Sequence, residues 1–268
     1  MEFHTAFSGD VPQLYEAYLG PVLFEPYAED LAARIDPAGS QHVLELACGT
    51  GRLTRHLLRV LPLHASITAT DLNEGMLNLA ARQTPDPRLQ WNVVDALEIP
   101  FLDGSFDTVI CQFGCMFFTD KPRAFSEIFR VMKKGGRFLF NTWEAPDKNP
   151  AAMIMQDVMQ ELFGERAPDF FLKGPFSFYD QEVIQQLLAA AGFHSLSIES
   201  LSKEMPYTSA SDFTTGFVDG SPLTAFLKKW PAAEREAATA ELKTRLEARF
   251  IEMGSLVHME ALVISAYK

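Results

Sequence analysis

Short apolar runs rich in β-branched residues alternate with longer amphipathic stretches through the first half of the chain. The runs lie at 42–46, 66–70, 89–94, 106–111 and 137–143, and helical patterns of roughly ten or more residues separate most of them. A further amphipathic stretch over 11–35 precedes the first run. This alternation is typical of βαβ units, so it predicts an α/β fold with a mostly parallel sheet and helices on both faces.

The alternation stops at 144–152, where Pro146 and Pro150 interrupt the pattern. A helical stretch, "AAMIMQDVMQELF", and an aromatic loop, "APDFFLKGPFSFYD", come next. The remaining predicted elements are a helix at 181–190, a strand near 194–200, a mostly helical block over about 208–250, and a last strand in "SLVHMEALVISAY". The segments that interrupt the sheet are rich in Phe, Met and Leu, so they must pack on the core or cover a pocket.

The turn after the first predicted strand has the sequence "VLELACGTGRLT" (43–54). Gly49 and Gly51 lead into a helix as a dinucleotide fingerprint does, but Thr54 occupies the place of the third glycine. This turn lies at the carboxyl edge of the sheet, where open α/β sheets bind ligands. Thr54 argues against a pyrophosphate, which needs the helix start packed closely beneath it. A bare strand-to-helix turn with no ligand is the alternative.

Three more predicted strands end in polar groups at the same edge. Asp71 ends the second strand, where a carboxylate can accept hydrogen bonds from two ribose hydroxyls or act as a helix N-cap. Asp95 follows the third strand, and its carboxylate with the N–H of Ala96 suits the edge of an adenine, although a turn acid is an equal reading. Gln112 and Phe113 end the fourth strand and can close over a nucleoside. The set predicts a nucleoside site.

The composition excludes several other classes of function. The chain has 268 residues, 47% of them hydrophobic, which suffices for one large domain or a domain with a cap. Its net charge of -12 repels phosphate backbones, so no nucleic-acid partner is expected. The densest basic group, "KKGGR" at 133–137, is interpreted as a helix end capped by Gly135 or Gly136.

The N-terminal sequence lacks a signal-peptide core, and no uncharged apolar run reaches the roughly 18 residues that span a bilayer. We therefore expect a cytoplasmic protein with no membrane span. Cys48, Cys111 and Cys115 are expected to stay reduced, because they lack paired metal-site spacing and the chain is too long to need disulfides. No cluster of His, Cys, Asp and Glu has ligand spacing, so no metal is expected. The oligomeric state is not determined by the sequence.

Five segments in succession resemble one family. "VLELACGTGRLT", "ATDLNEGML", "VVDALEIPF", "FDTVICQFGCMFF" and "GGRFLFNTWE" are similar to the motifs of class I S-adenosylmethionine-dependent methyltransferases, in particular the type 11 group that includes the ubiquinone and menaquinone biosynthesis enzymes. The resemblance spans about 43–144 and implies a Rossmann-like sheet with an antiparallel last strand and helical lid insertions. It divides a single domain, 1–268, into a helical lead-in or lid (1–36), a cofactor-binding core (37–144) and acceptor-side cap insertions (145–180 and 206–250).

The resemblance also implies which residues hold S-adenosylmethionine. Glu45 and the turn Ala47, Cys48, Gly49 and Gly51 face the methionine part; Thr54 matches a position that contacts the cofactor in some relatives; Asp71 holds the ribose; Leu72 and Met76 pack on the adenine; Asp95 and Ala96 read its edge; Gln112 lies beside the methionine moiety. Aromatic faces attract the sulfonium cation, which gives Phe113, Phe117 and Tyr15 or Tyr18 a role besides packing.

Methyl transfer is an in-line displacement, so proximity, orientation and exclusion of water supply much of its acceleration. A general base is needed only if the acceptor must lose a proton. His258, Glu260 and His4 are the weak candidates, and a strand histidine with no catalytic role is the alternative for His258. The apolar insertions predict a small, partly apolar acceptor. A nicotinamide-dependent oxidoreductase and a non-catalytic S-adenosylmethionine-binding protein are the rival functions.

Overall fold

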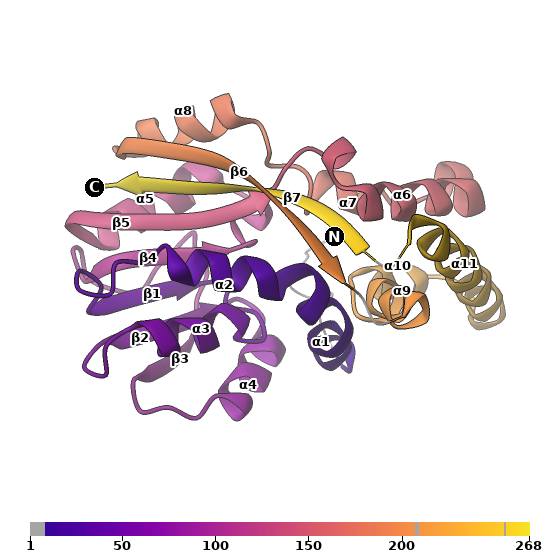
Figure 1. Ribbon diagram of the computed structural model, residues 1–268, viewed down its shortest axis with the longest axis horizontal. Helices are drawn as coiled ribbons and strands as arrows, with labels where there is room; N and C mark the ends of the chain where they lie inside the picture. Colours follow the sequence, from indigo (N-terminus) through magenta and orange to yellow (C-terminus); the bar gives the residue numbers. More distant parts are fainter. Residues whose placement is uncertain (1–8, 207–208, 255) are drawn as a thin grey trace.

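A seven-stranded sheet forms the centre of the protein, whose computed structural model describes residues 9–206, 209–254 and 256–268. The strand order is β3-β2-β1-β4-β5-β7-β6, and β7 runs antiparallel to both of its neighbours while β1 to β5 are parallel (Figure 1). The strands are β1 (His42–Leu46), β2 (Ser66–Asp71), β3 (Leu89–Val93), β4 (Phe106–Gln112), β5 (Met132–Trp143), β6 (His194–Pro206) and β7 (Leu256–Tyr267). The predicted α/β architecture is confirmed.

Both faces of the sheet carry helices because successive strand residues point to opposite sides. Val43 and Leu44 of β1 illustrate this, since they belong to different hydrophobic clusters. The cluster of Val43 includes α2 (Glu25–Ala33) and α3 (Arg52–Val60). The cluster of Leu44 includes α5 (Lys121–Val131) and α8 (Gln181–Ala191), and α4 (Glu74–Gln83) packs beside β2 and β3.

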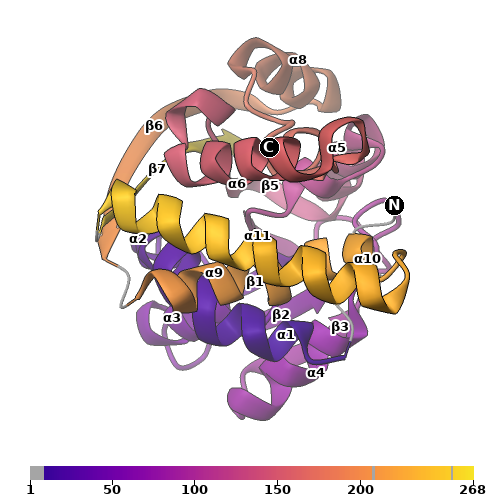
Figure 2. The same ribbon diagram turned by 90° about the vertical axis from the view of Figure 1, so that its right-hand side faces the viewer.

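A helical layer lies beyond the carboxyl ends of the parallel strands, at the right of Figure 1 and facing the viewer in Figure 2. It contains α6 (Pro150–Phe163), α7 (Phe170–Lys173), α9 (Ala210–Asp219), α10 (Leu223–Leu227) and α11 (Ala232–Met253). The lead-in, α1 (Val11–Leu14) and the π-helix η2 (Tyr15–Phe24), packs against α9. Two segments far apart in sequence therefore meet over the edge where the predicted ligand residues lie.

The element boundaries differ from the sequence predictions in three places. The lead-in is not one α-helix, because η2 is a π-helix that contains Pro21, and π-helical turns often accompany functional sites. Helix α5 ends at Val131, and Gly135 and Gly136 lie within β5, so the interpretation of "KKGGR" as a capped helix end is wrong. Strand β6 continues to Pro206 and pairs with β7 over its length.

Candidate cofactor and acceptor site

The turn after β1 bends sharply through residues with positive φ, namely Ala47 (52°), Gly49 (56°) and Gly51 (79°). A Cβ at Gly51 would lie 3.0 Å from the Cβ of Ala80, so this glycine lets α4 pack against the turn. Gly49 has open space on its Cβ side, and its backbone N–H donates to Asp71 Oδ2 at 2.8 Å. The two glycines therefore have different tasks, one in packing and one at the open side of the turn.

Glu45 is buried directly behind this turn. Its Oε2 accepts a 2.6 Å hydrogen bond from the hydroxyl of Thr54, while Oε1 is buried without a hydrogen-bond partner among the described residues. Burial raises the pKa of Glu45 to about 8, against the opposing effect of the Thr54 hydrogen bond. Thr54, in the place of the third glycine, thus orients the Glu45 carboxyl group through one of its oxygens.

Arg52 opens helix α3 beside Glu45. Its Nη1 donates to Glu25 and its Nη2 to the carbonyl oxygen of Glu16, at 2.6 and 3.0 Å. Its Nε is buried and has no acceptor in the part of the chain that the structure describes. Glu16 also accepts from the side chains of Thr50 and Arg55, at 2.5 and 2.7 Å. This ionic cluster fastens the π-helix to the glycine turn.

A cavity of about 510 Å³ opens at the carboxyl edge of the sheet, within the size range of small-molecule sites. A smaller cavity of about 40 Å³ adjoins it, and the two share Tyr15, Phe24, Ala47, Gly49 and Gln112 as lining residues. Glu45, Cys48 and Arg52 line the smaller cavity. Glu45 and Arg52, each with one buried polar atom that lacks a described partner, therefore both line one small chamber.

The ends of β2 and β3 supply one wall of the larger cavity, with Asp71, Leu72, Asn73, Met76, Val94, Asp95, Ala96 and Leu97 as lining residues. Asp71 accepts from the backbone N–H groups of Gly49 and Asn73 through its two oxygens. The N-cap of α4 is Asn73, so Asp71 does not cap that helix. Asp95 is exposed, and its Oδ1 accepts a turn hydrogen bond from Leu97 N at 2.9 Å. Asp95 thus stabilises the turn and also lines the cavity.

An aromatic wall closes the opposite side, beyond the end of β4. Phe113 has a positive φ of 50° and stacks on Trp143 with ring centroids 4.0 Å apart. Phe24 packs on the edge of Phe113, and Tyr15 stacks on Phe24 at 5.0 Å. Gln112 Nε2 donates to the carbonyl oxygen of Phe24 at 2.8 Å, which ties β4 to the end of η2. Burial raises the pKa of Tyr15, so this phenol stays neutral.

The structure brings most of the predicted cofactor residues to these two cavities. The residues that line at least one of them are Glu45, Ala47, Cys48, Gly49, Asp71, Leu72, Met76, Asp95, Ala96, Gln112, Phe113 and Phe117. Tyr18, Gly51 and Thr54 line neither cavity. Tyr18 instead packs near Gly216 of α9, where a Cβ would lie 2.9 Å from its own Cβ.

The candidate bases do not join the cavity. His4 lies outside the described residues. His258 lies near the start of β7, at the carboxyl edge of the parallel strands, but Met259 points into the cavity and successive strand residues point to opposite faces. The His258 side chain is 43% exposed and its Nε2 lies 3.5 Å from Glu260 Oε1, which is also outside the lining. The face of a residue in β7 depends on its register, which the sequence alone left open.

Sequence reasoning missed several lining residues because they come from separate elements. They include Leu19, Leu23 and Phe24 of η2, Trp143 at the end of β5, Ala152 of α6, Pro175 and Phe176, Phe217 of α9, Ser221 and Pro222, and Met259. Apolar side chains on a helix or a strand end carry no signal that separates a cavity wall from ordinary core. The aromatic residue that ends β5, in "NTWE", was the one locally visible hint.

The described residues offer neither a metal-binding cluster nor a membrane-spanning helix. Within residues 9–206, 209–254 and 256–268, no group of three or more His, Cys, Asp and Glu side chains is arranged to hold a metal ion. None of the helices in these ranges combines the length and apolar character that a membrane crossing requires.

Comparisons with known proteins identify the family. A family model described as a methyltransferase domain (Methyltransf_11) matches residues 44–140. The ubiquinone/menaquinone biosynthesis C-methyltransferase UbiE of Yersinia pestis (strain Pestoides F) is 30% identical over 174 residues, which cover 60% of this chain and 69% of the relative. UbiE of Proteus mirabilis (strain HI4320) is 29% identical over 175 residues, or 60% of this chain and 70% of that one.

This chain belongs to the class I S-adenosylmethionine-dependent methyltransferases, in the type 11 group. Solved structures share the fold of this methyltransferase. Phosphoethanolamine N-methyltransferase 2 of Haemonchus contortus, in complex with S-adenosyl-L-methionine, has a TM-score of 0.61 and 18% sequence identity. The match covers 96% of this chain and 56% of that one. A putative methyltransferase of Bacillus halodurans has a TM-score of 0.57 and 20% identity, covering 91% and 98%. The cofactor of this methyltransferase is S-adenosylmethionine, and its reaction is methyl transfer. The oxidoreductase and non-catalytic alternatives gain no support.

Proposed function

We propose that the smaller cavity holds the amino-acid end of S-adenosylmethionine. The cofactor's ammonium group would bind Glu45, whose Oε1 is buried without a described partner, and its carboxylate would bind Arg52 Nε. A buried acceptor and a buried donor in one small chamber are complementary to a zwitterion, and each costs free energy while unpaired. This pairing is the observation that carries the assignment of the site.

The adenosine end would lie along the wall built by β2 and β3. Asp71 lines this cavity at the end of β2, and its carboxylate would accept hydrogen bonds from the ribose hydroxyls. Leu72 and Met76 would pack on the adenine face, and Asp95 with the N–H of Ala96 would bind its edge. Phe113 and Phe117 line the same cavity and would face the sulfonium cation.

The acceptor is proposed to be small, apolar and without formal charge. Beyond the adenosine wall the lining is mostly apolar and includes Leu19, Ala152, Pro175, Phe176, Phe217, Pro222 and Met259. Thr119 and Ser221 add hydroxyl groups, and Ser221 donates to the carbonyl oxygen of Phe217. The names of the relatives refer to ubiquinone and menaquinone biosynthesis, and this apolar lining supports an acceptor of similar apolar character.

The bound cofactor supplies an activated methyl group, and the chain's own residues supply alignment and a dry chamber. Among the described lining residues of the larger cavity the ionisable side chains are Asp71, Asp95 and Tyr15. Both carboxylates lie on the proposed adenosine wall, and Tyr15 stays neutral. The described part of the chain therefore favours an acceptor atom that is nucleophilic without proton removal by the protein.

The lead-in and the segments 145–180 and 206–250 are proposed to act as the lid and cap of this chamber. Residues of η2, α6 and α9 supply the apolar lining opposite the sheet edge. The contact of Glu16 with Arg52 and Arg55 holds the lead-in over the glycine turn. Closure of such segments excludes water while donor and acceptor are aligned.

Calorimetric titration with S-adenosylhomocysteine tests the cofactor site. Asp71→Ala removes charged hydrogen bonds, so affinity falls about tenfold or more. Asp71→Asn keeps one acceptor oxygen for the backbone N–H groups, and its melting temperature reports whether the turn survives. Asp157→Ala, at an exposed position of α6 outside the cavity lining, is the control that leaves affinity unchanged. Equal affinity of wild type and both Asp71 variants would contradict the assignment of Asp71 to the cofactor site.

The acceptor is identified by release of S-adenosylhomocysteine from the methyl donor. Quinone-like, phenolic, fatty and amine compounds are compared at one concentration with the wild-type protein. Turnover is expected with an apolar, uncharged ring compound. Turnover confined to charged amines would contradict the apolar acceptor.

A further inference from the structure

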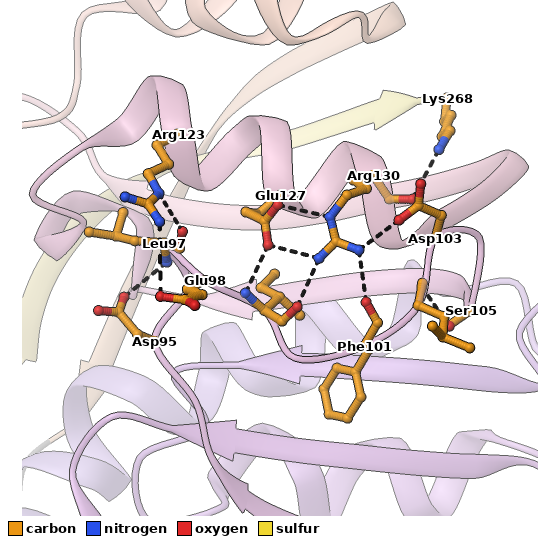
Figure 3. A network of polar contacts seen from close by, with 12 residues as sticks. Asp95, Leu97, Glu98, Phe101, Asp103, Ser105, Arg123, Glu127, Arg130 and Lys268 are labelled. Atoms are coloured by element: carbon orange, nitrogen blue, oxygen red, sulfur yellow. Dashed lines mark hydrogen bonds and ion pairs between the residues drawn. The ribbon is translucent and has the colours of Figure 1, made fainter.

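Three side chains on one face of α5 hold the segment that joins β3 to β4 (Figure 3). They are Arg123, Glu127 and Arg130, whose spacing of four and three residues places them on the same side of the helix. The segment they hold, residues 95–105, contains no helix or named strand. Side-chain contacts from α5 therefore fix its path together with a few isolated backbone hydrogen bonds, such as that from Gly104 N to Arg130 O.

Glu127 and Arg130 bind the middle of this segment through its backbone. Glu127 Oε2 accepts from Ile99 N at 2.9 Å, and Arg130 Nη2 donates to Ile99 O at 2.8 Å. Arg130 Nη1 donates to the carbonyl oxygen of Phe101 and to Asp103 Oδ1, both at 2.8 Å. The guanidinium and the carboxylate also pair with each other through two contacts of 2.8 Å. One ion pair thus satisfies both backbone groups of Ile99.

Arg123 extends the same contacts to the start of the segment. Its Nε donates to Leu97 O at 2.7 Å, while Leu97 N donates to Asp95 Oδ1 at 2.9 Å. Val94, Asp95, Ala96 and Leu97 are the residues of this connection that line the large cavity. The α5 side chains therefore hold the backbone directly behind the proposed adenine contacts, although none of the three lines the cavity.

The Glu127–Arg130 pair is partly shielded from water. The side chains of Glu127 and Arg130 are 22% and 31% exposed. The hydrogen-bonded Arg130 guanidinium holds the pKa of Glu127 below its usual range, so the carboxylate is ionised at neutral pH. Hydrogen bonds to ionised groups are roughly twice as strong as neutral ones, which suits a pair that must fix a loop.

We propose that Glu127 and Arg130 are positioning residues that set the adenine selectivity of the cofactor site. They act through Ile99, whose backbone they hold by two hydrogen bonds, and so fix the path of the loop that begins with Asp95 and Ala96. The inference rests on the proposed function, because it takes Asp95 and Ala96 as the adenine contacts. It predicts that a change on α5 alters which base the site prefers.

The test compares S-adenosylhomocysteine with S-inosylhomocysteine, in which oxygen replaces the adenine amino group and the adjacent ring nitrogen becomes a donor. Affinities are measured calorimetrically for wild type, Glu127→Ala and Arg130→Lys. Mutations at residues that couple to a binding site change affinity by about two- to thirtyfold. Each variant is expected to lower the affinity for S-adenosylhomocysteine by a factor in that range. The affinity for S-inosylhomocysteine is expected to fall by less than about twofold, so the preference for adenine falls.

The control is Glu241→Ala, which breaks a similar ion pair with Arg245 on α11 at 2.7 Å, away from the cavity lining. Its adenine preference is expected to equal that of wild type. If Glu127→Ala does not fold, Arg130→Lys decides, because it keeps the charge and loses the forked contacts.

If the affinities for both ligands fall equally, or if neither falls, the positioning role of Glu127 and Arg130 is wrong. The proposed cofactor site is not contradicted by that result. A wild type that binds both ligands equally overturns the adenine assignment of Asp95 and Ala96 as well.

Discussion

Glu45 links cofactor affinity to pH, because its pKa in the free protein is about 8. At pH 7 about nine-tenths of the free molecules therefore carry a protonated Glu45. A bound ammonium group favours the carboxylate, so binding releases a proton. We expect about 0.9 proton released at pH 7, and affinity for S-adenosylhomocysteine that rises about tenfold from pH 6 to pH 7, or roughly 1.4 kcal/mol.

Titration calorimetry in two buffers of different ionisation enthalpy measures the released protons directly. Glu45→Gln keeps the size of the side chain and an acceptor oxygen but cannot ionise, so proton release from this position disappears. Other titrating groups contribute equally to both proteins, which makes the difference between them the decisive quantity. Identical proton release by wild type and Glu45→Gln would refute the proposed ammonium contact.

The same raised pKa has a consequence for the unliganded protein. Because the folded-state pKa lies above the ordinary value of 4.5, the stabilising effect of protonated Glu45 is present below about pH 4.5 and is lost as the pH rises towards 8. The free energy of unfolding therefore carries a falling contribution of about 1.4 kcal/mol per pH unit between about pH 5 and 8. Urea unfolding of Glu45→Gln is expected to lack this slope. An identical slope in both proteins would show that Glu45 ionises normally.

Three further predictions concern the turn, the lid and metals. Gly51→Ala adds a Cβ close to Ala80 at a residue with positive φ, so it is expected to lower the free energy of unfolding by about 1–3 kcal/mol. Gly135→Ala is the control in urea unfolding, because Gly135 has a similar φ but open space around its Cβ position, and a smaller effect is expected. Hydrogen exchange in 9–20 and 209–230 slows when S-adenosylhomocysteine and an acceptor analogue bind; slow exchange without ligand would make these segments ordinary core. Turnover is expected to continue in the presence of EDTA. Loss of turnover that is restored by adding one metal ion would contradict this prediction.

The sequence alone determined the sheet and its ligand edge. Strand periodicity and the polar residues at strand ends are local signals, and parallel connection brings the ends of β1, β2, β3 and β4 to one edge. The antiparallel direction of the last strand followed from the family resemblance, and the structure confirms it. The longer-range pairing of β7 with β5 and β6 then decided which of its residues face the cavity, which is why His258 lies on the outer side and Met259 inside.

Only the tertiary structure decided the chemistry of individual residues. The raised pKa of Glu45 comes from burial beneath a helix and a turn, and its bond from Thr54 depends on how α3 docks on β1. Trp143 and Phe24 become cavity wall because β5 and η2 converge on Phe113. Contacts of this kind join residues distant in sequence, and a side chain's neighbours are fixed by packing rather than by its own period or type.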